Sequence, residues 1–228
     1  MTTSKLLKTA VCVAVASLGV TALQAQNLLT DPGFENQTPA ANGGWNLFNG
    51  AAFSSAQAHT GTMSMLDTGA GGFSVPGSDE VLPTGPGVEY QLTGFGLISS
   101  AIPANGDTDN GILQITFWSG PNATGNNLGS IDISNGGIAT GANNAQLSNP
   151  VNSSSPVGQW IPLDTGIAQA PVGAVSLEAF TLVLDQDPTA VYFDDLTLTL
   201  VQAPEPGTLT LLGLSLLGIP AFAWRRKK

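Results

Sequence analysis

Lysine and arginine are missing from most of this chain. Only six of the 228 residues are Lys or Arg, and these lie before residue 10 or after residue 224. Residues 26–203 contain 15 of the 16 acidic residues, together with a single histidine, His59. A surface without cationic side chains cannot neutralise phosphates, which excludes nucleic acid as a partner. The carboxylates of residues 26–203 must be solvated, hydrogen-bonded or metal-bound, because no Lys or Arg is there to pair with them.

The chain is equally poor in catalytic side chains. Its one cysteine, Cys12, lies in the apolar start, so the rest of the chain has no disulfide and no thiol chemistry. A single histidine cannot build a zinc triad, and no G-x-S-x-G nucleophile motif is present. We therefore expect no enzyme. Since two carboxylates suffice for glycoside hydrolysis, a secreted glycoside hydrolase stays as the weaker alternative.

Residues 1–25 have the layout of a processing signal. A short basic start precedes the apolar residues 9–22, which are too few to span a bilayer comfortably, and Ala25 offers a small residue for cleavage. We expect a secretory signal peptide over residues 1–25, removed by signal peptidase. The alternative is a retained anchor helix.

The C-terminal residues 203–228 form a second signal. Pro204, Glu205 and Pro206 are followed by the apolar run 208–224 and by four basic residues. A helix over this run would be about 25 Å long, the short limit for a membrane span. The prolines force an extended segment just outside the membrane, and the basic cluster would stay cytoplasmic. We expect a single transmembrane sorting helix, with a plain C-terminal anchor as the alternative.

This order of motif, helix and basic cluster closely resembles the PEP-CTERM sorting signal. The resemblance implies recognition of Pro204, Glu205 and Pro206 by an exosortase. It also implies a Gram-negative host that makes exopolysaccharide. The protein would then be an inner-membrane-anchored precursor before it reaches the cell surface or extracellular matrix.

Residues 26–202 are expected to form one all-β domain, an antiparallel β-sandwich of the jelly-roll type. Short runs of alternating polar and apolar residues recur between Gly-, Asn- and Pro-rich turns, and no amphipathic helix is apparent. Strands are predicted at residues 62–66, 89–97, 111–118, 129–133, 175–184 and 190–201. Asn-Gly dipeptides predict turns at residues 49–50, 105–106, 110–111 and 135–136.

Several landmarks of this domain, in order, resemble the carbohydrate-binding-module jelly rolls of the family 4/9 and galactose-binding-like type. They are the opening Asn27-Leu28-Leu29-Thr30-Asp31-Pro32-Gly33-Phe34-Glu35, which resembles the family's first strand, then Trp45, Pro86-Gly87-Val88-Glu89-Tyr90-Gln91-Leu92, Gln159-Trp160, Ala170-Pro171-Val172-Gly173-Ala174 and Val191-Tyr192-Phe193-Asp194-Asp195-Leu196-Thr197-Leu198. The resemblance speaks for the fold more than for an activity, because the same landmarks recur in exported proteins with no known ligand.

A structural Ca²⁺ commonly ties the first strand to the last in these jelly rolls, and Glu35 and Asp194 occupy the matching positions. Asp194 alternates with the apolar residues 196, 198 and 200, so we expect it to point inward, whereas Asp195 would face solvent. An inward carboxylate needs a partner, and a hard cation prefers carboxylate and carbonyl oxygens. Residues 105–111 also alternate oxygen donors, and are either the start of a calcium loop or an Asx-rich turn.

Three tryptophans of the domain are candidates for stacking on sugar rings. Trp118 is expected on the wetter face of its strand, the best place for a glycan platform. Trp45 would line a loop pocket, and Trp160 is expected to pack in the core.

The sequence thus favours an exported, non-catalytic component of the cell surface or exopolysaccharide matrix. The alternative is a carbohydrate-binding module that recognises a glycan through surface aromatics.

Overall fold

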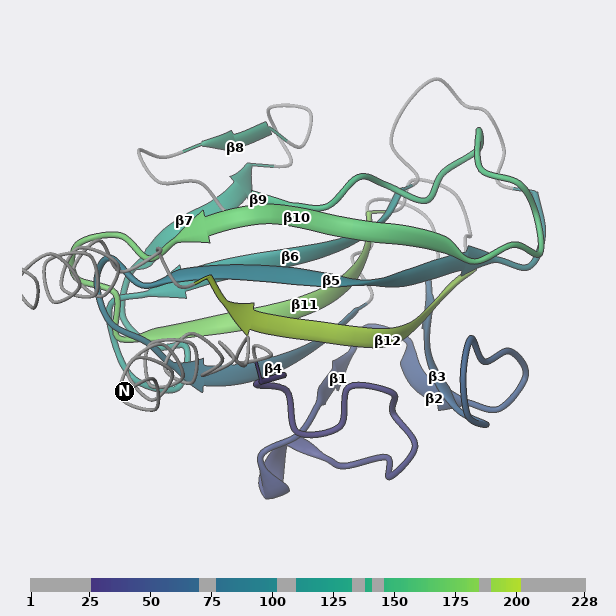
Figure 1. The fold of residues 1–228 in the computed structure, drawn as a ribbon, viewed down its shortest axis with the longest axis horizontal. Coiled ribbons are helices and arrows are strands. Elements are labelled where there is room, and N and C mark those ends of the chain that lie inside the picture. Colours follow the sequence, from purple (N-terminus) through teal and green to yellow (C-terminus); the bar gives the residue numbers. More distant parts are fainter. Residues whose placement is uncertain are drawn as a thin grey trace, which may run out of the picture.

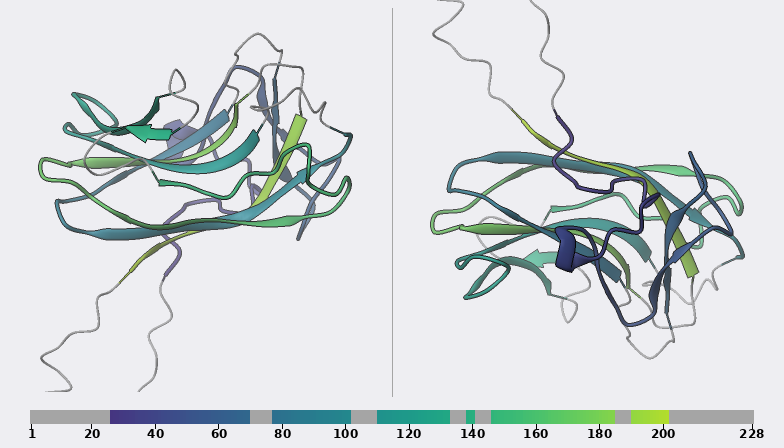
Figure 2. Two further views of the ribbon diagram at one scale, coloured as in Figure 1. Left: turned by 90° about the horizontal axis from the view of Figure 1, so that it is seen from above. Right: turned by 90° about the horizontal axis from the view of Figure 1, so that it is seen from below.

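A computed structural model describes residues 26–69, 77–101, 110–132, 138–140, 146–184 and 190–201. Within these ranges the chain folds into two antiparallel sheets stacked face to face, as Figures 1 and 2 show. The predicted antiparallel β-sandwich is therefore confirmed. The expected signal peptide, the sorting tail and residues 105–109 of the candidate calcium loop lie outside the described residues. None of the described segments is a helix long and apolar enough to cross a membrane.

The larger sheet has seven strands. Its order is β1 (Asn46–Phe48), β4 (Gly77–Pro83), β11 (Ser176–Leu184), β6 (Asn110–Trp118), β7 (Asn127–Asp132) and β8 (Ile138–Thr140), and β9 (Gln146–Leu147) also pairs with β6. The smaller sheet has five strands in the order β10 (Ile161–Gln169), β5 (Glu89–Ile98), β12 (Ala190–Leu200), β3 (Ser64–Thr68) and β2 (Ala51–Ser54). The single helical turn described is a 3₁₀ turn at Ala40–Asn42.

Local sequence explains which strands were predictable. Strands β5, β6, β11 and β12 follow the predicted runs within two residues, because their alternation is long and regular. Strands β4 and β10 were missed. β4 opens on the polar residues Gly77 to Glu80, and β10 contains Pro162 and a register shift between Asp164 and Ile167. Both features hide the alternation that marks a strand.

Two expectations about turns and strands are corrected. The predicted turn at Asn110 and Gly111 is instead the start of β6, where a Cβ on Gly111 would lie 2.7 Å from Val191. Glycine is needed there for close packing between the sheets. The opening segment 27–35, predicted as the first strand, runs beside β12 but is no assigned strand. Two backbone hydrogen bonds join it to β12, from Leu28 N to Leu198 O (2.9 Å) and from Leu196 N to Pro32 O (2.8 Å).

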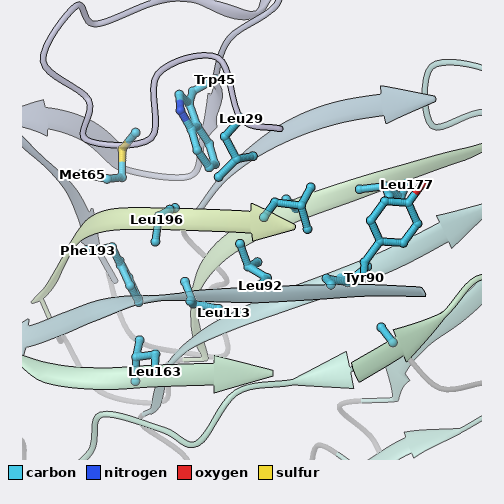
Figure 3. Packing of buried hydrophobic residues seen from close by; sticks show 14 of the residues in the cluster. Leu29, Trp45, Met65, Tyr90, Leu92, Leu113, Leu163, Leu177, Phe193 and Leu196 are labelled. Carbon is cyan, nitrogen blue, oxygen red and sulfur yellow. The ribbon is translucent and has the colours of Figure 1, made fainter. Parts of the chain in front are cut away.

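That opening segment closes one side of the sandwich and completes the core shown in Figure 3. Leu29, Phe34 and Trp45 are between 0% and 6% exposed, and the rings of Phe34 and Trp45 pack with centroids 5.0 Å apart. The indole Nε1 of Trp45 donates to Asp31 O (3.0 Å). Trp45 is only 1% exposed, so its indole is a core side chain and presents no surface for stacking on a sugar.

A bulge in β12 changes which residues face the core. The register of β12 against β5 shifts between Asp194 and Thr197, and Asp195 takes the left-handed conformation with φ of 50°. Val191 and Phe193 enter the core before the bulge, whereas Leu196 and Leu198 enter it afterwards. Asp194 therefore lies on the face opposite Phe193, and the predicted shared face with Leu196 is wrong. The loop at residues 59–60 covers Asp194 and leaves it 0% exposed.

Candidate functional site

The first candidate site lies where the opening segment meets the bulge of β12. Glu35 accepts hydrogen bonds from Met63 N (2.9 Å), Thr62 N (2.8 Å) and Thr62 Oγ1 (2.9 Å). The N–H of Met63, followed by the N–H and hydroxyl of Thr62, lowers the pKa of Glu35. A Cβ on Gly61 would lie 2.2 Å from Glu35 Oε1, so a glycine is required for this loop to close over the carboxylate.

Asp194 is held in a similar way. Its Oδ2 accepts from His59 N (2.7 Å) and Thr60 N (3.2 Å), and its Oδ1 accepts from Asp195 N (2.7 Å). Burial raises the pKa of Asp194, and the N–H groups of His59 and Asp195 oppose this rise. The partner that a buried carboxylate requires is supplied by backbone N–H groups. The shortage of Lys and Arg therefore does not by itself demand a cation.

Three acidic side chains approach one another beside Gly33. A Cβ placed on Gly33 would lie 3.9 Å from Asp194 Oδ1, 3.8 Å from Asp195 Oδ1 and 3.9 Å from Glu35 Cγ. Glu35 and Asp194 are thus neighbours across the first segment and the last strand. No group of three or more His, Cys, Asp or Glu residues in the described part of the chain has a geometry ready to hold a metal ion. Calcium at Glu35 and Asp194 stays a prediction.

The histidine of the chain joins this site from the same loop. His59 Nδ1 lies 2.6 Å from Asp195 Oδ2, and Thr60 Oγ1 donates to Asp195 Oδ1 (2.6 Å). The expected solvation of Asp195 is therefore wrong, since both of its oxygens have protein partners. Trp160, expected in the core, is half-buried and lies with its ring centroid 5.5 Å from that of His59. Sequence reasoning missed this cluster because its members have no regular spacing.

The second candidate site is the outer face of the larger sheet. Trp118, at the end of β6, is half-buried on this face, and its Nε1 donates to Glu178 Oε2 on β11 (2.5 Å). Phe180 is two residues further along β11 and packs edge-on against Phe48 of β1, with centroids 6.4 Å apart. The outer face therefore combines aromatic rings with a carboxyl group, and glycan binding at Trp118 stays a prediction.

Several polar side chains of this face are buried, Asp79, Gln114 and Glu178 among them. Burial raises the pKa of Glu178 to about 7, the neighbouring charge of Asp79 adds to the rise, and the Trp118 hydrogen bond opposes it. Burial also raises the pKa of Asp79, whose Oδ1 accepts from Asn46 Nδ2 (3.0 Å). Gln114 Nε2 donates to Thr116 Oγ1 (2.6 Å), while Gln114 Oε1 is buried with no hydrogen-bond partner. These groups can accept or donate hydrogen bonds to hydroxyls of a polar ligand.

The fold places the domain among the β-sandwiches found in carbohydrate-binding modules and in carbohydrate-active enzymes. It is similar to part of an arabinose-bound MgGH51 α-L-arabinofuranosidase, with a TM-score of 0.52 and 16% identity over 80% of this chain. It is also similar to the tandem CBM22-1–CBM22-2 domain of Paenibacillus barcinonensis Xyn10C, with a TM-score of 0.50 and 19% identity over 83% of this chain. The chain spans only 27% and 49% of those two chains, and such identities show the fold alone.

The sorting signal identifies the kind of protein more narrowly. Residues 202–227 match the PEP-CTERM protein-sorting motif, which contains the predicted Pro204, Glu205 and Pro206. The chain is an exported protein that is anchored at a membrane and sorted by an exosortase through this motif. No curated protein matches the chain as a relative.

Proposed function

We propose that this protein is a non-catalytic component of the cell surface or extracellular matrix of a Gram-negative bacterium, where it associates with exopolysaccharide. The sorting motif at residues 202–227 carries the proposal, because it delivers the β-sandwich outward and then releases it from its anchor. The acidic composition supports a matrix role. With no Lys or Arg in residues 26–203, contact with an acidic polysaccharide would depend on bridging divalent cations.

The test is fractionation of cells that produce exopolysaccharide. We expect the wild-type protein in the polysaccharide fraction, with release by a chelator if divalent cations bridge the two. A chain without residues 203–228 should stay out of that fraction and appear free in the medium or periplasm. An even distribution of the wild-type protein between matrix and medium would contradict the proposal.

The calcium ion expected at Glu35 and Asp194 belongs to this proposal. Its support is geometric: Asp194 Oδ1, Asp195 Oδ1 and Glu35 Oε2 each accept only one hydrogen bond among the described residues. A carboxylate oxygen can accept a second partner, so each of the three has capacity to bind a hard cation. An ion there would offset the repulsion between three carboxylates that lie around Gly33.

A second candidate function is glycan binding on the outer face of the larger sheet. The observation that favours it is the combination of Trp118, its acceptor Glu178 and the unpartnered Gln114 Oε1 on neighbouring strands. An aromatic ring can stack on a sugar ring, while amide and carboxyl groups bind its hydroxyls.

Binding of the mature domain to a panel of soluble neutral polysaccharides tests this second function. Trp118→Ala should weaken any binding at least about tenfold, the loss of roughly 1.4 kcal/mol that removal of a stacking ring can cause. Trp160→Ala is the matched control, since Trp160 is another half-buried tryptophan but lies beside β10 of the smaller sheet. Equal effects of both substitutions would remove the outer face as the site.

The same polysaccharides can be used to test the weaker alternative of a glycoside hydrolase. Asp79 and Glu178 supply two carboxyl groups on one face, and burial raises the pKa of both, that of Glu178 to about 7. Hydrolysis would require one group as acid and the other as base or nucleophile. Release of reducing sugar by the wild type, abolished in Glu178→Gln, would support an enzyme over the non-catalytic proposal.

A further inference from the structure

At one end of the sandwich, three of the described turns carry no charged side chain. Three turns meet there: residues 84–88 between β4 and β5, residues 119–126 between β6 and β7, and residues 170–175 between β10 and β11. None of these 19 residues is Asp, Glu, His, Lys or Arg, although the domain is strongly acidic. We call this end, together with residues 200–201, the uncharged pole.

Hydrogen bonds join the three turns into one rigid surface. Three backbone hydrogen bonds join the first and third turns: Gly87 N to Ala170 O (2.8 Å), Ala170 N to Val88 O (2.8 Å) and Thr84 N to Val175 O (3.0 Å). Ser176, directly after the third turn, accepts from Ala123 N (3.0 Å) and donates to Gly120 O (2.7 Å) of the second. The turns therefore hold their side chains in fixed positions.

The uncharged pole exposes apolar side chains. Val172 is 91% exposed at the tip of the third turn, between Pro171 and Gly173, whose φ is 91°. Val175 is 41% exposed and Leu200 is 39% exposed. The side chain of Val172 buries almost none of its apolar surface within the domain. Contact of that apolar surface with water is unfavourable.

The chain leaves the domain at this same pole. Strand β12 ends at Leu200, and Val201 N donates to Glu89 O (2.9 Å) at the start of β5. The sorting motif begins at residue 202 and its apolar run at residue 208. Residues 201–207 can span at most about 25 Å when fully extended. The uncharged pole is thus the end of the domain closest to the membrane while the tail is uncut.

We propose that the uncharged pole rests on the bilayer surface before processing, with Val172 in the interfacial lipid. The partner is the lipid itself. The tail keeps the pole at a high effective concentration near the membrane, so a few apolar side chains suffice where a free domain would not bind. The acidic remainder of the domain is repelled by anionic headgroups, which orients the uncharged pole toward the lipid. Docking would hold residues 204–206 close to the membrane, where an embedded enzyme can reach them.

A second Pro-Val-Gly turn provides a matched control. Val157 lies between Pro156 and Gly158 and is 49% exposed, and Gly158 N donates to Ile98 O (2.8 Å) at the far end of β5. It therefore presents the same residue triplet at the end of the sandwich away from the tail.

The experiment uses the full chain, with Cys12→Ser, reconstituted in vesicles of phosphatidylcholine and anionic phosphatidylglycerol. A polarity-sensitive fluorophore is attached at Val172→Cys or, as the control, at Val157→Cys. We expect a blue-shifted emission and several-fold weaker quenching by iodide at position 172 than at position 157. Val175→Asp in the position-172 chain should restore quenching, because it places a charge on an exposed part of the pole.

Two results would overturn the proposal. Equal quenching at both positions would show that the pole stays in water. Protection of position 172 that appears only when the processing enzyme is added to the vesicles would assign the surface to that protein and not to lipid.

Discussion

The imidazole of His59 stacks on the ring of Phe95, with centroids 3.9 Å apart and planes inclined by 20°. The same imidazole reaches Asp195 through Nδ1. His59 thereby fastens the loop that covers Asp194 to the outside of the smaller sheet.

We expect His59→Ala to lower the free energy of unfolding by about 1–2 kcal/mol, the loss of one aromatic contact and one hydrogen bond. His59→Phe keeps the stacking and should recover about half of the loss. Urea denaturation of both variants measures this. An unchanged midpoint for His59→Ala would show that the loop is held without it.

Calcium at Glu35 and Asp194 would stabilise the folded state by mass action, by about 2.7 kcal/mol at 100 times its Kd. A chelator should therefore lower the melting temperature of the mature domain loaded with Ca²⁺. Glu35→Gln and Asp194→Asn should each abolish this shift. Asp164→Asn, which alters an exposed carboxylate on β10, should leave it intact. Identical melting curves of the calcium-loaded wild type with and without chelator would rule the ion out.

The raised pKa of Glu178 makes stability depend on pH. The folded state holds this proton up to about pH 7, whereas the unfolded state releases it near the ordinary pKa of 4.5. Stability is therefore highest below pH 4.5 as far as Glu178 is concerned, and falls as pH rises toward 7. Burial raises the pKa of Asp67, Asp79 and Glu80 as well, and these groups act in the same direction. Glu35, with a lowered pKa, acts in the opposite direction below pH 4.5.

Glu178→Gln removes the titrating group and should reduce the loss of stability between pH 4.5 and 7 by about 1–2 kcal/mol. The effect is smaller than the full pKa shift would give, because solvent screens the partly buried carboxyl group. Denaturant titrations at several pH values provide the measurement. Glu89→Gln, at the half-buried start of β5, controls for the change in net charge. A parallel pH profile for Glu178→Gln and the wild type would refute the assignment.

The sorting motif yields a prediction in the cell. Replacing Pro204, Glu205 and Pro206 with alanine should leave the chain uncut and retained in the membrane, because the extended acidic segment beside the helix is lost. Immunoblots of membrane and released fractions would detect the change. A variant with only Thr208→Ala should be processed normally. Release of the triple variant at the wild-type level would contradict a sorting role for these residues.

The sheet architecture was predictable where alternation is long, as in β5, β6 and β12, because the core selects every second residue. The bulge at Asp195 was not predictable, since a single left-handed residue reverses the alternation without a glycine to mark it. The proximity of Glu35 to Asp194 followed from the resemblance to jelly rolls. Their partners did not, because the N–H groups of residues 59–63 come from a loop whose path the sequence does not reveal.

On the outer face of the larger sheet, too, some features could be predicted from the sequence and others could not. Alternation placed Trp118 on the wetter face, and the register with β11 then brings Glu178 to its indole. The raised pKa of Glu178 could not be foreseen, because it depends on cross-strand burial and on Asp79 from β4, a strand that the sequence did not mark.

The hydrogen bonds of Asn27 have a consequence for how the domain folds. Its side chain donates to Leu196 O (2.8 Å) and accepts from Leu198 N (3.0 Å), so the start of the domain is secured by its last strand, 169 and 171 residues away. Leu29, Phe34 and Trp45 cannot be enclosed until β12 is in place. Contacts between residues this far apart in the sequence form slowly. We therefore expect the sandwich to close only once the final strand has joined it.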